Sequence, residues 1–439
     1  MAFFFYMIKI YTESKFLEEK KYVFHVILKE ILGLDFCVYD TSVSQIYKFV
    51  LPNQKYIEFA DDFFTHIPES IGYCEARYLP QKLVMSKQIA NEDIPFLYGN
   101  TSYTEHEQFA YCGGDVIASA FFLLSRWEEI ALTALDKWGR FDENESFIVK
   151  TDLVKKPVVH IYANIIKQLF GKYGYEIEEN RTFAKVLTHD VDFVYKWSNK
   201  WDYVKTCLAD VVKRHSLHLL RTTMEMRKNG RDPYDTYDYL MRMSEQNKVK
   251  SIFYFLKTRQ NNVHLLSEKG KNIIQSITNR GHIIGLHTNY YKEADKGKIF
   301  SDKESLESLT QRKLVLNRQH YLRLQMPQTM ELLQQCGLEQ DSSLYFSHHP
   351  GFRTGMCIEH SLFNCLTHKM LKIKELPLVL MDTSLLSCKN TSEALACVDA
   401  LLQEVKKYHG NFVCLWHNSS FNAREWNSLR EVYDHILKA

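Results

Sequence analysis

Residues 187–197 read LTHDVDFVYKW. The apolar run that leads into them predicts a β-strand, in which Asp190 and Asp192 point to one side and His189 to the other. Two carboxylates would then stand together at the end of a strand. One could bind a cation while its neighbour remains free to act as a general base.

Further along the chain, short β-branched or aromatic runs alternate with helical segments. The predicted strands are FAKVLT (183–188), SIFYFL (251–256), HIIGLH (282–287), a run near HYLRL (320–324), one near LEQDSSL (338–344), IKELPLVL (373–380) and NFVCLWH (411–417). The helical segments between them are LLSEKGKNIIQSITNRG (265–281), SLESLTQRKLVLNRQ (305–319), PQTMELLQQCG (327–337) and NTSEALACVDALLQEVKKYHG (390–410). This alternation is typical of a parallel sheet, and seven strands in roughly 250 residues favour a barrel.

Polar residues follow several of these strands. His287 ends the third, His320 lies in the fourth region between Arg318 and Arg323, and His417 ends the last. In parallel barrels the loops after the strands build the active site, so these side chains are candidate site residues. A divalent cation among them would polarise a carbonyl and activate water, which is the chemistry that hydrolyses an amide.

Three of these segments carry a family resemblance. THDVD (188–192), GHIIGLHTNYY (281–291) and LWHN (415–418) resemble the motifs of the polysaccharide deacetylase superfamily, which includes NodB homologues and carbohydrate esterase family 4. The resemblance covers roughly residues 183–420. It implies a distorted (β/α)7 barrel that removes N- or O-acetyl groups from sugars with a divalent metal, most commonly zinc.

The resemblance also implies roles for single residues. Asp190 corresponds to the general base, Asp192 and His287 to metal ligands, and His417 to the catalytic acid. The stretch RQHYLRLQMP (318–327) takes the place of the motif whose arginine orients the base. Both Arg318 and Arg323 are candidates for that arginine.

One position departs from the family pattern. Tyr291 stands where the family has its second metal-binding histidine, and a neutral tyrosine is a poor ligand. His320 is the best replacement, whereas His189 is disfavoured by its parity in the strand unless the strand has already ended. Two alternatives remain, namely weak metal binding through Asp192, His287 and water, or a barrel that has lost catalysis and keeps only a sugar-binding cleft.

The first part of the chain has no assigned role in this scheme. We predict a smaller mixed α/β domain over residues 1–178 and the NodB-like barrel over residues 179–439. AFFLLSRWEEI (120–130), WGRFDENESF (138–147) and GFRTG (351–355) make the whole chain similar to bacterial polysaccharide deacetylase-like proteins with an extra N-terminal domain. Such proteins are often associated with surface-polysaccharide biosynthesis.

Four further residues are candidate substrate contacts. Trp197 and Trp416 flank the first and last motifs, Tyr291 stands in the metal motif, and Arg353 could reach an acidic group of a substrate. For the tryptophans, core packing is at least as good an explanation.

The composition limits the classes of binding partner that we expect for this protein. The 439 residues carry a formal charge of +2, which provides no basic field for nucleic acid, and no apolar stretch is long enough for a membrane helix. Ten singly spaced cysteines favour reduced thiols and a cytoplasmic protein. We therefore expect a carbohydrate partner, and the sequence gives no oligomeric state. The alternatives are an amidase acting on a small non-sugar amide and a non-catalytic carbohydrate-binding or assembly protein.

Overall fold

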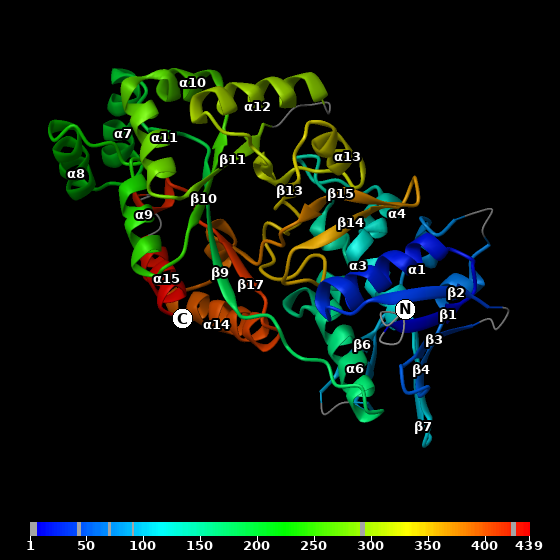
Figure 1. The fold of residues 1–439 in the computed structure, drawn as a ribbon. Helices are drawn as coiled ribbons and strands as arrows, with labels where there is room; N and C mark the ends of the chain where they lie inside the picture. The colour runs from blue at the N-terminus through cyan, green and yellow to red at the C-terminus, as the bar shows by residue number, and fades with distance from the viewer. Residues whose placement is uncertain (1–6, 42–44, 69–71, 90–91, 290–294, 423–426) are drawn as a thin grey trace.

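The computed structural model describes residues 7–41, 45–68, 72–89, 92–289, 295–422 and 427–439 (Figure 1). In these residues the protein is a mixed α/β structure with a six-stranded sheet, a nine-stranded sheet and a two-stranded hairpin. The six-stranded sheet and the hairpin come from the first part of the chain, and the nine-stranded sheet comes from the second.

The six-stranded sheet has the order β2-β1-β3-β4-β8-β7. Its strands are β1 (Ile8–Thr12), β2 (Phe36–Asp40), β3 (Ile46–Val50), β4 (Tyr56–Ala60), β7 (Gly99–Glu105) and β8 (Phe109–Gly114). The hairpin joins β5 (Val84–Ser86) to β6 (Ile94–Phe96). Buried residues alternate with more exposed ones along β1 and β3, because a single face of this sheet packs against helices.

Helices of the first part cover that face and also contact the second sheet. They are α1 (Leu17–Phe24), the π-helical segment η2 (His25–Ile31), α2 (Phe63–His66), α3 (Val116–Ser125), α4 (Trp127–Leu132), α5 (Phe147–Lys150) and α6 (Val158–Lys172). The buried carboxylate of Asp115 begins α3 by accepting a hydrogen bond from the backbone N–H of Ala118 (2.8 Å). Phe24 of α1 packs against Phe36 of β2 and Phe49 of β3, while α1 and α3 contact strands of the second sheet, so a helical layer lies between the two sheets (Figure 1).

The nine-stranded sheet has the order β14-β15-β13-β12-β11-β10-β9-β17-β16. Its strands are β9 (Ala184–Val191), β10 (Ser251–Leu256), β11 (Ile283–Thr288), β12 (Leu316–Gln319), β13 (Gln340–Asp341), β14 (His360–Asn364), β15 (Lys369–Glu375), β16 (Leu380–Met381) and β17 (Asn411–Leu415). All its pairs are parallel except β14 with β15. Every residue of β10 is buried, as expected where both faces of a parallel strand are covered.

The nine-stranded sheet is open, because the strands at its two ends, β14 and β16, form no ladder with each other in the described residues. Residues 376–379 nevertheless connect the two sides of the opening. The backbone N–H of Leu376 donates to the carbonyl of Asp341 (2.8 Å), and that of Val379 donates to the carbonyl of Val413 (3.0 Å). The predicted parallel α/β arrangement is confirmed, whereas a barrel closed by strand pairing is not formed.

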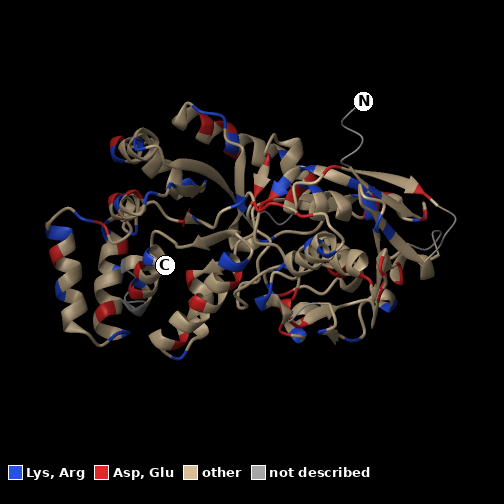
Figure 2. Ribbon diagram, turned by 60° about the horizontal axis from the view of Figure 1, so that its bottom comes forward, with Lys and Arg blue, Asp and Glu red and all other residues tan. Residues whose placement is uncertain are grey.

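Helices surround the outer side of this sheet in Figure 1. They are α7 (Lys200–Val212), α8 (Leu217–Lys228), α9 (Tyr237–Gln246), α10 (Arg259–Leu266), α11 (Glu268–Asn279), α12 (Lys296–Thr310), α13 (Gln328–Gln335), α14 (Thr391–Lys407) and α15 (Asn427–Lys438). Short 3₁₀ turns complete the described chain, namely η3 (Ala76–Tyr78), η4 (Glu143–Glu145), η5 (Leu153–Lys155), η6 (His320–Leu322), η7 (Asp382–Ser387) and η8 (Ser420–Asn422). Basic and acidic residues are interspersed along these helices (Figure 2).

The fourth predicted strand was misplaced. The strand is β12, and the predicted run 320–324 is instead a 3₁₀ turn followed by irregular chain. The predicted helix over residues 305–319 is wrong in its second half, because α12 ends at Thr310 and residues 316–319 form β12. Asn317, Arg318 and Gln319 are consecutive and all buried, so β12 has polar side chains on both faces and lacks the apolar pattern of a strand.

Buried ion pairs connect the two parts of the chain. Arg353, in the loop before β14, donates from Nη2 to Glu129 of α4 (2.7 Å), and Arg126 donates from Nε to the same carboxylate (2.8 Å). Burial opposes the charge of Glu129, yet the two guanidinium groups lower its pKa. The apolar core is also continuous across residue 178, so the domain boundary at that position stays a prediction.

In the part of the chain that the structure describes, no helix has the length and apolarity to cross a membrane. All ten cysteines are free thiols. The cytoplasmic location stays a prediction.

Replacing Arg353 with methionine should lower the free energy of unfolding by about 3 kcal/mol, because Glu129 would keep only Arg126 as a partner in a buried site. Urea denaturation followed by circular dichroism measures the loss. The matched control is Lys155→Met, since the pair of Lys155 with Asp152 is exposed and should contribute less than about 1 kcal/mol. An equal loss in both variants would contradict a stabilising role for the buried pair.

Candidate functional site

The end of β9 brings two carboxylates to one side of the sheet. Asp190 and Asp192 both lie close to His287 at the end of β11, with carboxylate-to-Nε2 distances of 3.6 and 3.2 Å. His189 points the other way, where its Nδ1 donates to the carbonyl of Trp416 (2.9 Å). The predicted parity is therefore present, and His189 is a buried core residue.

Arg318 is the arginine that contacts Asp190. It is fully buried on β12 and donates from Nη1 to Oδ1 of Asp190 (3.2 Å) and to the hydroxyl of Thr188 (2.7 Å). Its Nε and Nη2 donate to the carbonyl and hydroxyl of Ser342 (2.8 Å each). Because all three guanidinium nitrogens donate hydrogen bonds, Arg318 holds the carboxylate of Asp190 in a fixed position. Arg323 makes no hydrogen bond with Asp190 in the described residues.

Asp192, His287 and His320 form a cluster with the geometry of a metal site. One ligand atom from each lies within 4.8 Å of the other two. Nε2 of His287 is 3.2 Å and Nε2 of His320 is 3.6 Å from Oδ1 of Asp192. Asp192 follows β9, His287 lies near the end of β11 and His320 follows β12, so the three side chains come from one edge of the sheet, with β10 between β9 and β11.

The state of these side chains fits a divalent cation. Oδ1 of Asp192 is buried and accepts no hydrogen bond from the described residues. His287 donates from Nδ1 to the carbonyl of Arg318 (2.9 Å), so Nε2 is the ring nitrogen that faces the cluster. Burial opposes the charge of His287, but the carboxylates of Asp190 and Asp192 raise its pKa, and a metal ion would take the place of the Nε2 proton. Burial and the charge of His287 lower the pKa of His320 to about 4, so its imidazole is neutral and able to bind a metal. One carboxylate and two imidazoles form a donor set that is typical of zinc.

His417 approaches the cluster from the end of β17, and its Nε2 is 3.9 Å from Oδ2 of Asp192. Its Nδ1 lies 2.9 Å from the carboxylate of Asp382, which also accepts hydrogen bonds from the backbone N–H of His417 (2.8 Å) and the hydroxyl of Ser420 (2.6 Å). Burial opposes the charged form, but Asp382 raises the pKa of His417 to about 10. This histidine is therefore protonated at neutral pH.

Asp382 was not among the predicted site residues. It directly follows β16, where the rule that polar residues at strand ends are site candidates would have identified it. The predicted strand over residues 373–380 corresponds to the end of β15 and the start of β16, and Asp382 lies two residues beyond its predicted end.

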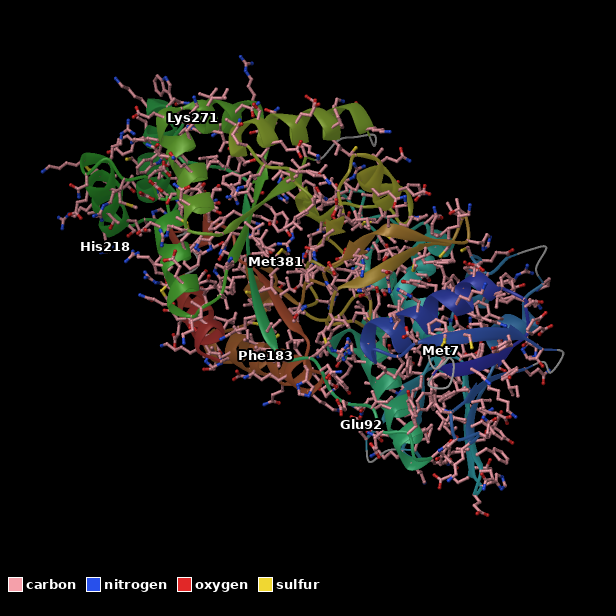
Figure 3. All side chains as sticks on the ribbon, in the orientation of Figure 1. Met7, Glu92, Phe183, His218, Lys271 and Met381 are labelled. Carbon is pink, nitrogen blue, oxygen red and sulfur yellow. The ribbon has the colours of Figure 1, made fainter. Side chains whose placement is uncertain are left out.

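A cavity of about 750 Å³ contains the whole cluster. Met381, labelled in Figure 3, lines it near the middle of the molecule. The lining residues from the first part of the chain are Leu135, Asp136, Lys137, Trp138, Arg140, Asp142, Glu143 and Asn144. The first part of the chain therefore forms one wall of the candidate site.

The proposed substrate contacts are mostly located elsewhere. Trp197 is buried and donates from its indole N–H to the hydroxyl of Thr206 (3.0 Å), and Trp416 packs in the core against Tyr433. Neither tryptophan lines the cavity. Arg353 is buried in the ion pair described above, and Tyr291 lies outside the described residues.

A family model matches part of the chain. Residues 8–174 match a family of unknown function, DUF7033. The match covers less than half of the chain, and no curated protein matches it.

Several solved structures are similar to the chain at low identity. A protein of Mycobacterium smegmatis assigned to the polysaccharide deacetylases is 18% identical, with a TM-score of 0.38, over 59% of this chain and 85% of that protein. A polysaccharide deacetylase of Bacillus cereus is 11% identical, with a TM-score of 0.29, over 59% of this chain and 86% of that protein. A family-4 carbohydrate esterase pseudoenzyme of Bacillus anthracis is 8% identical, with a TM-score of 0.31, over 59% of this chain and 63% of that protein.

Proposed function

We propose that this protein is a metal-dependent hydrolase that removes the acetyl group from an N-acetylated sugar or polysaccharide precursor. The observation that carries the proposal is the convergence of three groups in one cavity. They are a carboxylate held by a buried arginine, a cluster of three metal-binding side chains and a histidine supported by a buried carboxylate. The deacetylase-like motifs in the sequence agree with this chemistry.

We further infer that the nine-stranded sheet corresponds to the distorted (β/α)7 barrel that the sequence predicts. The support is the segment 376–379, which spans the opening of the sheet through hydrogen bonds on both sides. In such a fold the ends of the parallel strands point into one cavity, which accounts for the position of the cluster.

Asp192, His287 and His320 would hold the metal. When bound there, a divalent cation supplies Lewis-acid polarisation of the acetyl carbonyl and a lower pKa for water. The neutral His320 takes the place of the histidine that the family has four residues after His287. The site is thus built with a ligand from the next strand.

Asp190 is the proposed general base. Its carboxylate is kept in place by Arg318 and takes a proton from the water that attacks the acetyl carbonyl. His417 is the proposed general acid, and it donates its proton to the sugar nitrogen as the carbon–nitrogen bond breaks. Water and amide are thereby converted to acetate and a free amine.

The walls of the cavity suit a sugar ring. Trp138 lines the cavity and is 40% exposed, so its ring offers apolar surface beside polar groups such as Gln319 and Thr383.

Zinc content tests the metal site. After zinc loading and desalting, the wild-type protein should retain about one zinc ion per chain, measured by elemental analysis. Asp192→Ala, His287→Ala and His320→Ala should each lose it, because each removes one of the ligands. His218→Ala is the matched control, since His218 is exposed on α8 (Figure 3). Retention of zinc by His320→Ala alone would show that another residue is the third ligand, and an empty wild type would rule out the metal mechanism.

Acetate release from chitotetraose tests the reaction. Asp190→Asn and His417→Ala should each lower kcat by about 10²–10⁴-fold, because each removes one proton-transfer group, and both should keep their zinc. The same assay with simple N-acetylated amides distinguishes a deacetylase from an amidase. A zinc-loaded wild type without turnover of either substrate would favour a carbohydrate-binding protein.

A further inference from the structure

The turn that carries His320 has an unusual backbone. Tyr321 and Leu322, the next two residues, have φ angles of 60° and 54°. This left-handed region is disfavoured for residues with a side chain, and a bulky residue there persists only where its surroundings hold it. Contacts around the turn must therefore fix the position of His320.

Some of these contacts come from the first part of the chain. Arg140 donates from Nη1 to the backbone carbonyl of Tyr321 (3.2 Å). Arg140 is itself held by Asp136, whose carboxylate accepts from its Nε (2.8 Å) and from its backbone N–H (2.9 Å). Because Asp136 holds Arg140, the guanidinium of Arg140 has a fixed position from which it donates to the carbonyl of Tyr321.

A stack of three rings forms the second contact. The rings of Trp138 and Tyr321 are stacked with centroids 5.1 Å apart and planes at 11°, and Tyr321 in turn stacks on the imidazole of His320 at 4.0 Å and 24°. Nε2 of His320 is 3.6 Å from Asp192 at the far end of the stack. Rigid aromatic contacts of this kind restrict the orientation of the imidazole.

We propose that residues 136–140 of the first part position His320 as the third metal ligand, with Trp138 and Arg140 as positioning residues. The inference rests on the metal site of the proposed function and assigns a role to the first part of the chain within it. His320 takes the place of a family ligand that this chain lacks. It also begins a strained turn, so it depends on outside support more than His287, which lies within a regular strand.

Zinc affinity of the full-length protein tests this role. Competition with a chromophoric chelator should give a zinc affinity about ten-fold or more weaker for Trp138→Ala and for Arg140→Ala, as for other residues that orient metal ligands. Trp138→Phe keeps a ring against Tyr321 and should restore most of the affinity. Trp201→Ala is the matched control, because Trp201 is 72% exposed on α7 and should leave zinc affinity unchanged. Equal affinity in wild type and Trp138→Ala, with zinc stoichiometric in both, overturns the inference and leaves the metal site intact.

Hydrogen–deuterium exchange in the zinc-free protein gives a second measurement. Peptides that contain residues 320–323 should exchange faster in Trp138→Ala than in wild type, with no change in β9, β10 and β11. A global increase in exchange would indicate a merely structural effect and would overturn the inference. If the wild-type protein binds no zinc, the metal site and this role are both rejected. That result differs from failure of the inference alone, in which wild type and Trp138→Ala both bind zinc with equal affinity.

Discussion

The buried guanidinium of Arg318 is the interaction around which the site is organised. A buried charge is tolerated only when its donors are satisfied, and here Thr188, Asp190 and Ser342 accept from it. These partners fix β9, β12 and the loop after β13 relative to one another. The backbone carbonyl of Arg318 also accepts from His287, so one residue orients both the proposed base and a proposed metal ligand.

The cluster of Asp192, His287 and His320 offers three donor atoms without a second histidine from the segment after β11. The family pattern takes two histidines from one motif, but this chain has tyrosine at residue 291. Because neighbouring parallel strands end at the same edge, the residue after β12 lies as close to Asp192 as a second histidine after β11 would need to be. In the proposed site, His320 would supply the missing imidazole from the end of β12, so the tyrosine at residue 291 does not by itself indicate loss of the site.

The parallel α/β arrangement could be predicted because strands such as β10 are continuous apolar runs between helical segments. The pattern failed at β12, whose inward side chains are polar because they build the site. Strand parity correctly separated Asp190 and Asp192 from His189. Burial of Trp197 and Trp416 was not predictable from their positions beside motifs, since whether an aromatic ring faces a cavity or the core depends on contacts far away in sequence.

The first part of the chain is better described as a component of the site than as an attached module. Its helices share a continuous core with the second part, and residues 135–144 line the cavity that holds the metal cluster. A ligand on a strained turn needs support from outside its own strand, and the stack from Trp138 to His320 reaches it from this segment. In the proposed site the third ligand therefore depends on both parts of the chain, because Arg140 and Trp138 contact the turn after β12.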